Sequence, residues 1–245
     1  MTARPASAAL AAALLAFATS ACSVGGQSVS GSGRPASESR PVAPFDAISA
    51  SLPGEIVLRQ GPAAPVLVET DDNLLPLVET VVEDGTLRIR LRPEWRVVGR
   101  APLRVVVTAP ALRSVNLTGA VDVQADRLSV PELDVTVAGS GDVRIGQVET
   151  GTLRLTVAGS GDFRAAGRAG EFTARVAGSG DIDAEALETK RASIAIAGSG
   201  DARVWATESL AARIAGSGDV SYRGTPAVTR SVAGSGSVRP AGTGS

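Results

Sequence analysis

The sequence predicts an all-β protein with one main domain, a parallel β-helix (β-solenoid) of about 18–20 residues per coil in the C-terminal half. A five-residue phrase, Ala-Gly-Ser-Gly-Asp, recurs through that half and returns a last time without its aspartate. Apolar residues alternate on both sides of the copies. A short unit that repeats at this period stacks on its neighbours and buries a continuous core. The copies begin at Ala138, Ala158, Ala177, Ala197, Ala215 and Ala233, after a degenerate forerunner at Thr118–Asp122.

Each repeat is predicted to contain a strand, a corner, a second strand and a variable connector. In one copy the apolar positions are Leu153, Leu155 and Val157 before the motif, then Phe163 and Ala165 after it. A spacing of two is the period of a β-strand, in which alternate side chains face the same side. Strands this short cannot bury an apolar face alone, so successive units should place like residues over like.

The Gly-Ser-Gly-Asp part of the motif is predicted to form the corner between the two strands. Glycine adopts the positive φ angles of a tight corner without a steric penalty, and stacked corners approach to about 4.8 Å, which favours small residues. The serine can bond to local backbone groups. It is not predicted to be a nucleophile, because the chain has no histidine to activate it. The predicted corner residues are Gly139, Ser140, Gly141, Asp142, Gly159, Ser160, Gly161, Asp162, Gly178, Ser179, Gly180, Asp181, Gly198, Ser199, Gly200, Asp201, Gly216, Ser217, Gly218 and Asp219.

The motif aspartates should form a column along the stack. Carboxylates about 5 Å apart repel each other by roughly 0.8 kcal/mol in water, so something should offset that repulsion. One candidate is the residue two positions after each aspartate, which would give an exposed ladder of alternating charge. In successive copies that residue is Arg144, Arg164, Asp183 and Arg203. The other candidate is calcium, by analogy with denser glycine-aspartate repeats. The sequence favours the charge ladder, and we predict no metal and no other cofactor.

The N-terminus predicts export. Residues 1–21 have the features of a signal peptide, with Arg4, an apolar run over Ala8–Ala18 that is too short to span a bilayer, and small residues before the cleavage point. Cys22 follows directly and is the only cysteine. This arrangement resembles the bacterial lipoprotein signal, in which the cysteine is lipidated; the alternative is an ordinary secretory signal. Residues 22–44 are therefore predicted to be a lipidated cysteine and a disordered tether rich in Gly, Ser and Pro.

Residues 45–240 are predicted to form one continuous β domain, followed by a short tail at 241–245. The part before the repeats keeps the alternation of strands, as in Leu87–Leu91, and Glu83–Thr86 has the composition of a hairpin turn. We expect these N-terminal strands to form irregular first coils and a cap over the open end of the core.

Several phrases resemble one bacterial family. Phe45–Ile48, Glu69–Leu75, Gly85–Ile89, Ala109–Leu112 and the Ala-Gly-Ser-Gly-Asp repeats are similar to the family called putative auto-transporter adhesin, head GIN domain. The resemblance covers roughly residues 45–237. It implies a right-handed β-helix that is exported and often lipid-anchored, with no established chemistry and no catalytic residues to transfer.

Composition argues against several classes of function. A formal net charge of −1 gives no general attraction to nucleic acid, and 3% aromatic residues are too few for stacking platforms on bases or sugars. The absence of histidine removes the commonest general base and metal ligand. A single cysteine allows no disulfide within the chain.

The sequence thus predicts a protein of the cell envelope that is not an enzyme. We expect it to be exported and held on a membrane by its lipid, facing the periplasm or the cell exterior, and to act in binding, adhesion or surface display. The expected partners are that membrane and an envelope protein or polysaccharide, with no nucleic acid. A purely structural envelope component is one alternative. A polysaccharide-active β-helix enzyme is disfavoured, because Trp95, Trp205 and Tyr222 are scattered over different coils.

Overall fold

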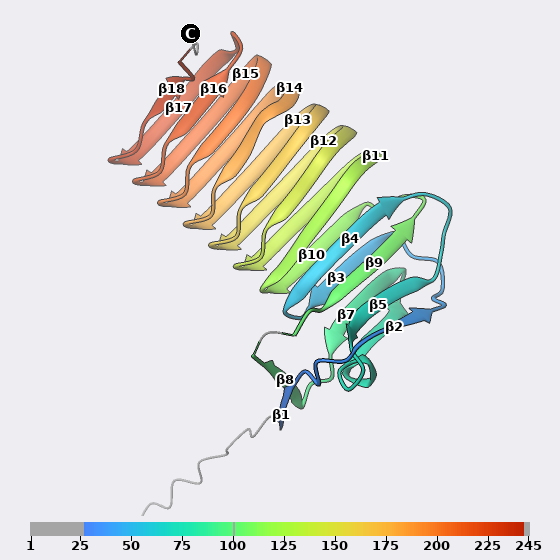
Figure 1. Ribbon diagram of the computed structural model, residues 1–245. Helices are drawn as coiled ribbons and strands as arrows, with labels where there is room; N and C mark the ends of the chain where they lie inside the picture. The colour runs from blue at the N-terminus through green and yellow to red at the C-terminus, as the bar shows by residue number, and fades with distance from the viewer. Residues whose placement is uncertain (1–26, 100, 243–245) are drawn as a thin grey trace, which may run out of the picture.

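A computed structural model describes residues 27–99 and 101–242, which form a β-solenoid of about six turns (Figure 1). The predicted parallel β-solenoid is confirmed. The coils of the repeat region are β11 (Val121–Gly139), β12 (Val143–Gly159), β13 (Phe163–Gly178), β14 (Ile182–Gly198) and β15 (Ala202–Gly216), followed by β16 (Val220–Arg223), β17 (Ala227–Gly234) and β18 (Val238–Pro240).

Each strand from β11 to β15 bends around most of a coil. Its first part, after one motif, lies in a sheet that we call the aspartate wall, and its last part, which leads to the next motif alanine, lies in a second sheet that we call the alanine wall. β16 and β18 extend the aspartate wall, and β17 extends the alanine wall. Successive coils pair in parallel with like over like, as in Gly139 on Gly159 and Gly178 on Gly198. The segments predicted as connectors also form β-strand. Their pairing is interrupted by register shifts in each of the pairs β12–β13, β13–β14 and β14–β15.

The N-terminal part contains shorter strands. They are β1 (Gln27–Ser30), β2 (Pro35–Arg40), β3 (Ala47–Ser51), β4 (Gly54–Gln60), β5 (Val66–Asp71), β6 (Val78–Glu83), β7 (Thr86–Leu91), β8 (Trp95–Val98), β9 (Arg104–Ala109) and β10 (Ser114–Gly119), with a single turn of 3-10 helix, η1 (Leu75–Leu77).

β3 and β4 form the first coil, which stacks directly on β10 and β11 although more than fifty residues separate them in the sequence. The intervening strands lie beyond this coil. β7 and β6 extend the alanine wall, and β9, β5 and β2 extend the aspartate wall, with β6, β5 and β2 running antiparallel to their neighbours. The predicted hairpin joins β6 to β7 through Asp84 and Gly85, whose φ angles are +49° and +72°. These strands continue both walls beyond the first coil, and the cap over the open end of the core stays a prediction.

The prediction of a disordered tether is wrong for residues 27–44. β1 pairs with β8, and β2 pairs along its whole length with β5. Polar contacts also hold the segment: the Gly33 N–H donates to Asp71 Oδ2 at 3.0 Å, and the Arg40 guanidinium donates to the carbonyls of Leu75 and Val78. A polar edge strand needs no apolar face, because it is held by its ladder of backbone hydrogen bonds. The predicted signal peptide and Cys22 lie outside the described residues, as do residues 243–245 of the tail.

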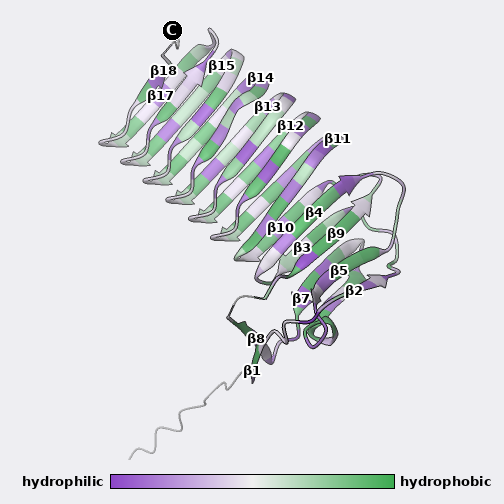
Figure 2. Ribbon diagram, in the orientation of Figure 1, coloured by the Kyte–Doolittle hydropathy of each residue, from purple (hydrophilic) through white to green (hydrophobic). Residues whose placement is uncertain are grey.

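The core runs along the axis between the two walls. Inward side chains form columns of Val, Leu, Ile and Ala, and the alternation of apolar and polar residues is visible along each strand (Figure 2). Phe163 and Phe172, from opposite walls of β13, stack with their ring centroids 6.3 Å apart. Burying a Val, Leu, Ile or Phe side chain stabilises a fold by about 1.5–3 kcal/mol, so the repeated column is the main source of stability.

Candidate binding surface

The motif forms the corner at which each coil passes from the alanine wall to the aspartate wall. In the copy that ends β14, Gly198 has a φ of +144° and lies directly over Gly178. The Ser199 N–H donates to the Gly178 carbonyl at 3.0 Å, while its side chain is exposed, and Gly200 is buried. The same N–H bond recurs at the other copies, at 2.9–3.0 Å. The serines therefore contribute backbone contacts to the stack.

The motif aspartates have a structural role that the sequence analysis missed. Each carboxylate accepts a hydrogen bond from the backbone N–H of the residue at the same motif position one coil further on, which is an aspartate in every case except the last. In the middle of the stack, the Asp181 N–H donates to Asp162 Oδ1 at 2.9 Å, and the Asp201 N–H donates to Asp181 Oδ1 at 2.8 Å. Charge-assisted hydrogen bonds of this kind are stronger than neutral ones. Backbone donors therefore offset part of the repulsion within the column.

The ends of the column explain which copies keep the aspartate. Asp122, in the degenerate forerunner, already accepts from the Asp142 N–H at 2.9 Å. In the final copy Ser237 replaces aspartate, and both its N–H and its hydroxyl donate to Asp219 Oδ1 at 2.8 Å. The described chain stacks no further motif on Ser237, so no acceptor is required there. The hydroxyl of Ser237 and then its N–H lower the pKa of Asp219, so this carboxylate supports the fold at neutral pH and loses that effect only in acid.

Arginines flank the aspartate column, as predicted. Arg144, Arg164, Asp183 and Arg203 stand in register on successive coils. Arg144 pairs with Asp142 at 2.8 Å, and Arg164 pairs with Asp183 at 2.8 Å. A small polar hollow of about 130 Å³ lies over these side chains. Exposed ion pairs contribute about 0–1 kcal/mol each, so this ladder balances charge more than it stabilises the fold.

Metal ligation finds no support in the described part of the chain. No group of three or more acidic, histidine or cysteine side chains there is arranged to hold an ion. The Oδ1 atoms of the aspartate column already accept backbone hydrogen bonds. The solvated charge ladder stays a prediction, and calcium is its alternative.

The alanine wall carries a groove that the sequence analysis did not predict. It has a volume of about 580 Å³ and crosses β12, β13, β14, β15 and β17. The motif alanines are exposed along it, and the groove is open to solvent. Its lining residues are Thr156, Val157, Arg175, Val176, Ala177, Ala195, Ile196, Ala197, Arg213, Ile214, Ala215, Ser231 and Ala233.

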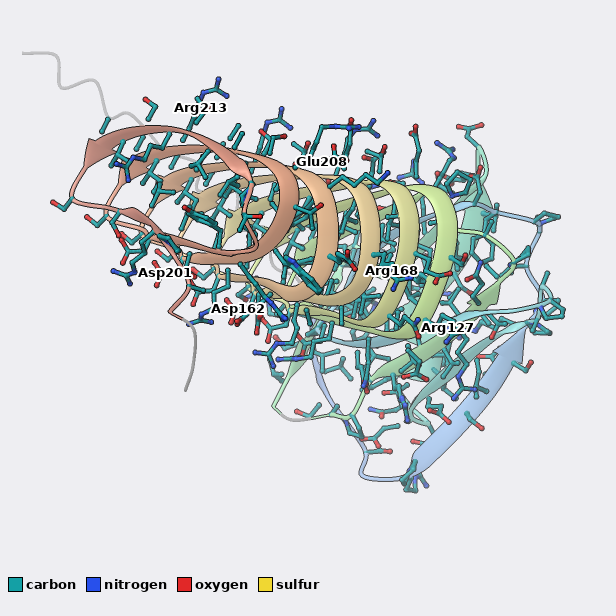
Figure 3. All side chains as sticks on the ribbon, turned by 90° about the horizontal axis from the view of Figure 1, so that it is seen from above. Arg127, Asp162, Arg168, Asp201, Glu208 and Arg213 are labelled. Carbon is teal, nitrogen blue, oxygen red and sulfur yellow. The ribbon has the colours of Figure 1, made fainter. Side chains whose placement is uncertain are left out.

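Two arginines give this groove its charge. Arg175 and Arg213 are the only charged residues in the lining, and Ala195 lies between them in the register. None of the ion pairs among the described residues involves either arginine. Figure 3 shows Arg213 on the opposite side of the coils from Asp162 and Asp201. The aspartate wall carries acidic residues and arginines side by side, whereas this groove is positive and partly apolar.

The signal for the groove is present in the sequence. The outward position two residues before each motif alanine reads Thr136, Thr156, Arg175, Ala195, Arg213 and Ser231. The core is predicted by the inward positions, and the charge ladder by the positions after the motif. A comparison of the outward columns before the motif reveals two arginines without acidic neighbours in their own column.

Fold and surface together define a repeat-built β-solenoid with one wall of mixed charge and one positive groove. The chain belongs to the family described as "Putative auto-transporter adhesin, head GIN domain", whose model matches residues 44–226. The resemblance in the sequence is therefore confirmed. No curated protein matches the sequence.

Solved structures share this fold. A crystal structure named as a putative adhesin from Bacteroides fragilis has a TM-score of 0.83 and 26% identity, covering 87% of this chain and 100% of that chain. Another named as a putative adhesin, from Parabacteroides distasonis, has a TM-score of 0.69 and 27% identity, covering 88% and 100%. A third, named as a putative lipid binding protein from the same species, has a TM-score of 0.73 but 24% identity, covering 88% and 100%, and supports the fold alone.

The names of the family and of the two neighbours at 26% and 27% identity are those of adhesins rather than enzymes. Among the described residues, no helix is long and apolar enough to cross a membrane.

Proposed function

We propose that this protein is an exported cell-envelope binding protein, held on a membrane by a lipid on Cys22, which presents the alanine wall to a partner. The groove of that wall carries the proposal, because its two arginines lack acidic partners among the described residues and lie on strands that are paired on both sides. The family's adhesin description supports the same role. The function is binding or adhesion without catalysis.

The binding role predicts that a carboxylate placed in the groove abolishes retention of a partner. Ala195→Glu puts an acid between Arg175 and Arg213, where it would pair with both and block the groove. The matched control is Ala186→Glu, the same change at an exposed position of β14 outside the groove. Immobilised full chain should retain a component of the protein or polysaccharide fraction of the envelope, and only Ala195→Glu should lose it. Equal retention by both variants would contradict the assignment of the wall.

A purely structural envelope component is the second candidate, and the regular stacking of the coils favours it. If the parent chain retains nothing from either envelope fraction, that candidate replaces the binding role.

Lipid anchoring predicts that Cys22→Ala releases the protein from membranes. Each buried CH₂ of an acyl chain contributes about 0.8 kcal/mol to membrane binding, so a chain without its lipid should partition into the soluble exported fraction. The measurement is fractionation of cells that produce the parent or the variant, followed by immunoblotting. Ser23→Ala is the control, since it leaves the cysteine in place. Equal membrane association of the parent and Cys22→Ala would show that the anchor is not this lipid.

A further inference from the structure

The groove of the alanine wall has a repeat and a charge that together indicate its partner. Arg175 and Arg213 lie two coils apart, with only the methyl group of Ala195 between them. Strands lie about 4.8 Å apart, so the two positions are separated by about 10 Å along the solenoid axis. The groove extends over five coils, from Thr156 to Ser231, so an extended ligand would run across the strands and parallel to the axis.

Resting on the proposed function, we propose that the groove binds an acidic polysaccharide, with one anionic group of the polymer on Arg175 and another on Arg213. Guanidinium groups form forked hydrogen bonds with carboxylates, sulfates or phosphates. Between the two arginines the floor is made of alanine methyl groups, against which the C–H face of a sugar ring can pack. A repeating polymer suits a repeating floor, because each coil offers nearly the same surface.

An acidic peptide fits this groove less well. A peptide usually gains affinity on a sheet by adding a strand to a free edge. The floor strands from β12 to β15 pair with neighbours on both sides, so their backbone N–H and C=O groups are already used. A peptide lying over Arg175 and Arg213 would therefore depend on side-chain contacts alone, because the free strand edge belongs to β17 at the end of the groove. It would also lose its own backbone hydrogen bonds to water.

A lipid also fits less well. Small-molecule pockets generally bury most of their ligand's surface. This groove is open, and its floor consists of short methyl groups above a paired sheet, so an acyl chain would keep one side in water. A polysaccharide tolerates that exposure, because its hydroxyl groups remain hydrated.

The test measures binding of the purified full chain to polygalacturonate, a polymer with one carboxylate per sugar, by calorimetry. Arg175→Gln and Arg213→Gln should each weaken binding about fivefold, and the double variant should weaken it more than about tenfold. Arg203→Gln, an exposed arginine of β15 on the aspartate wall, is the matched control and should bind as the parent does. Raising the ionic strength to about 0.5 M should weaken the parent's binding.

Three further probes distinguish the partner's class. Fully methyl-esterified polygalacturonate keeps the sugars without their charge and should not bind. Polyglutamate and vesicles of anionic phospholipid carry the charge without the sugar and should bind at least tenfold more weakly. Equal binding of either would overturn the assignment to a polysaccharide, as would polygalacturonate binding that survives in the double variant. If polygalacturonate does not bind at all, the inference fails, while the proposed binding role is still judged separately by the Ala195→Glu comparison with envelope fractions.

Discussion

Gly198→Ala should destabilise the solenoid by more than about 2 kcal/mol. A Cβ atom built on Gly198 would lie 1.9 Å from the carbonyl oxygen of Gly178, far inside contact distance. That oxygen cannot withdraw without breaking its hydrogen bond from the Ser199 N–H. The φ of +144° adds backbone strain, and a residue held in such a region costs about 1–3 kcal/mol. Denaturant unfolding followed by far-UV circular dichroism gives the difference in the free energy of unfolding.

Substitutions at three other glycines distinguish the two causes of this destabilisation, which are backbone strain and the clash between stacked corners. Gly119 has a φ of +90° with no atom within 4 Å of a built Cβ, so Gly119→Ala reports backbone strain alone. A Cβ on Gly200 would lie 2.1 Å from the Gly180 carbonyl oxygen without a positive φ, so Gly200→Ala reports the clash between stacked corners. Gly242 has neither feature, and its replacement should cost almost nothing. If Gly198→Ala is no more destabilising than Gly242→Ala, the corners do not nest as described.

The repeat region was predictable because its information is local and periodic. The alternate spacing of inward residues such as Leu153, Leu155 and Val157 predicts a strand, and the period of the motif copies predicts that the coils stack. The turn at Asp84 and Gly85 was predictable for a similar reason, since adjacent residues with positive φ have a characteristic composition. Register then follows from the motif, because a shift by one residue would bring inward side chains to the surface.

The N-terminal arrangement was less predictable, because its pairings are not sequential. The coil formed by β3 and β4 stacks on β10 and β11, with five strands inserted between them in the sequence. Nothing local in Ala47–Gln60 indicates that partner. The same limit applies to β2, whose polar residues resemble a linker until β5 lies beside them. Composition indicates whether a strand has an apolar face. It does not indicate whether the strand's backbone can pair with the edge of a sheet.

The role of the aspartates was missed for a different reason. A pattern of side chains indicates side-chain partners, whereas the partner of each carboxylate is a backbone N–H, which every residue except proline carries. The sequence did contain a clue. Aspartate occurs in five copies, while the position two residues later varies, and aspartate disappears only at Ser237. Because aspartate stays while the neighbouring side chain varies, the pattern favours the backbone as its partner, which is the same in every copy.

Arg230 of the last described coil lies across the open end of the core. Removing its charge should cause the protein to self-associate. In β17, Val228, Arg230 and Val232 pair with the core residues Leu210, Ala212 and Ile214 of β15, so all three are inward positions. The two valines are 37% and 39% exposed, because the described chain places no strand on the outer side of β17. The Arg230 guanidinium donates to the Val238 carbonyl on the opposite wall at 3.1 Å and so crosses the open end of the core.

An inward charge on a free edge strand opposes edge-to-edge pairing. If two copies met end to end with their β17 strands antiparallel and centred on Arg230, the two arginines would face each other and repel.

Arg230→Val removes this repulsion and leaves an unbroken apolar end beside the free edge of β17. We expect a concentration-dependent rise in mass toward twice that of the parent, measured by sedimentation, while the free energy of unfolding changes by less than about 1 kcal/mol. Arg213→Val, the same change on the outward face one coil earlier, should leave the mass unchanged. Identical sedimentation of the parent and Arg230→Val would show that this arginine does not guard the end of the solenoid, and that the edge of β17 is protected by another feature.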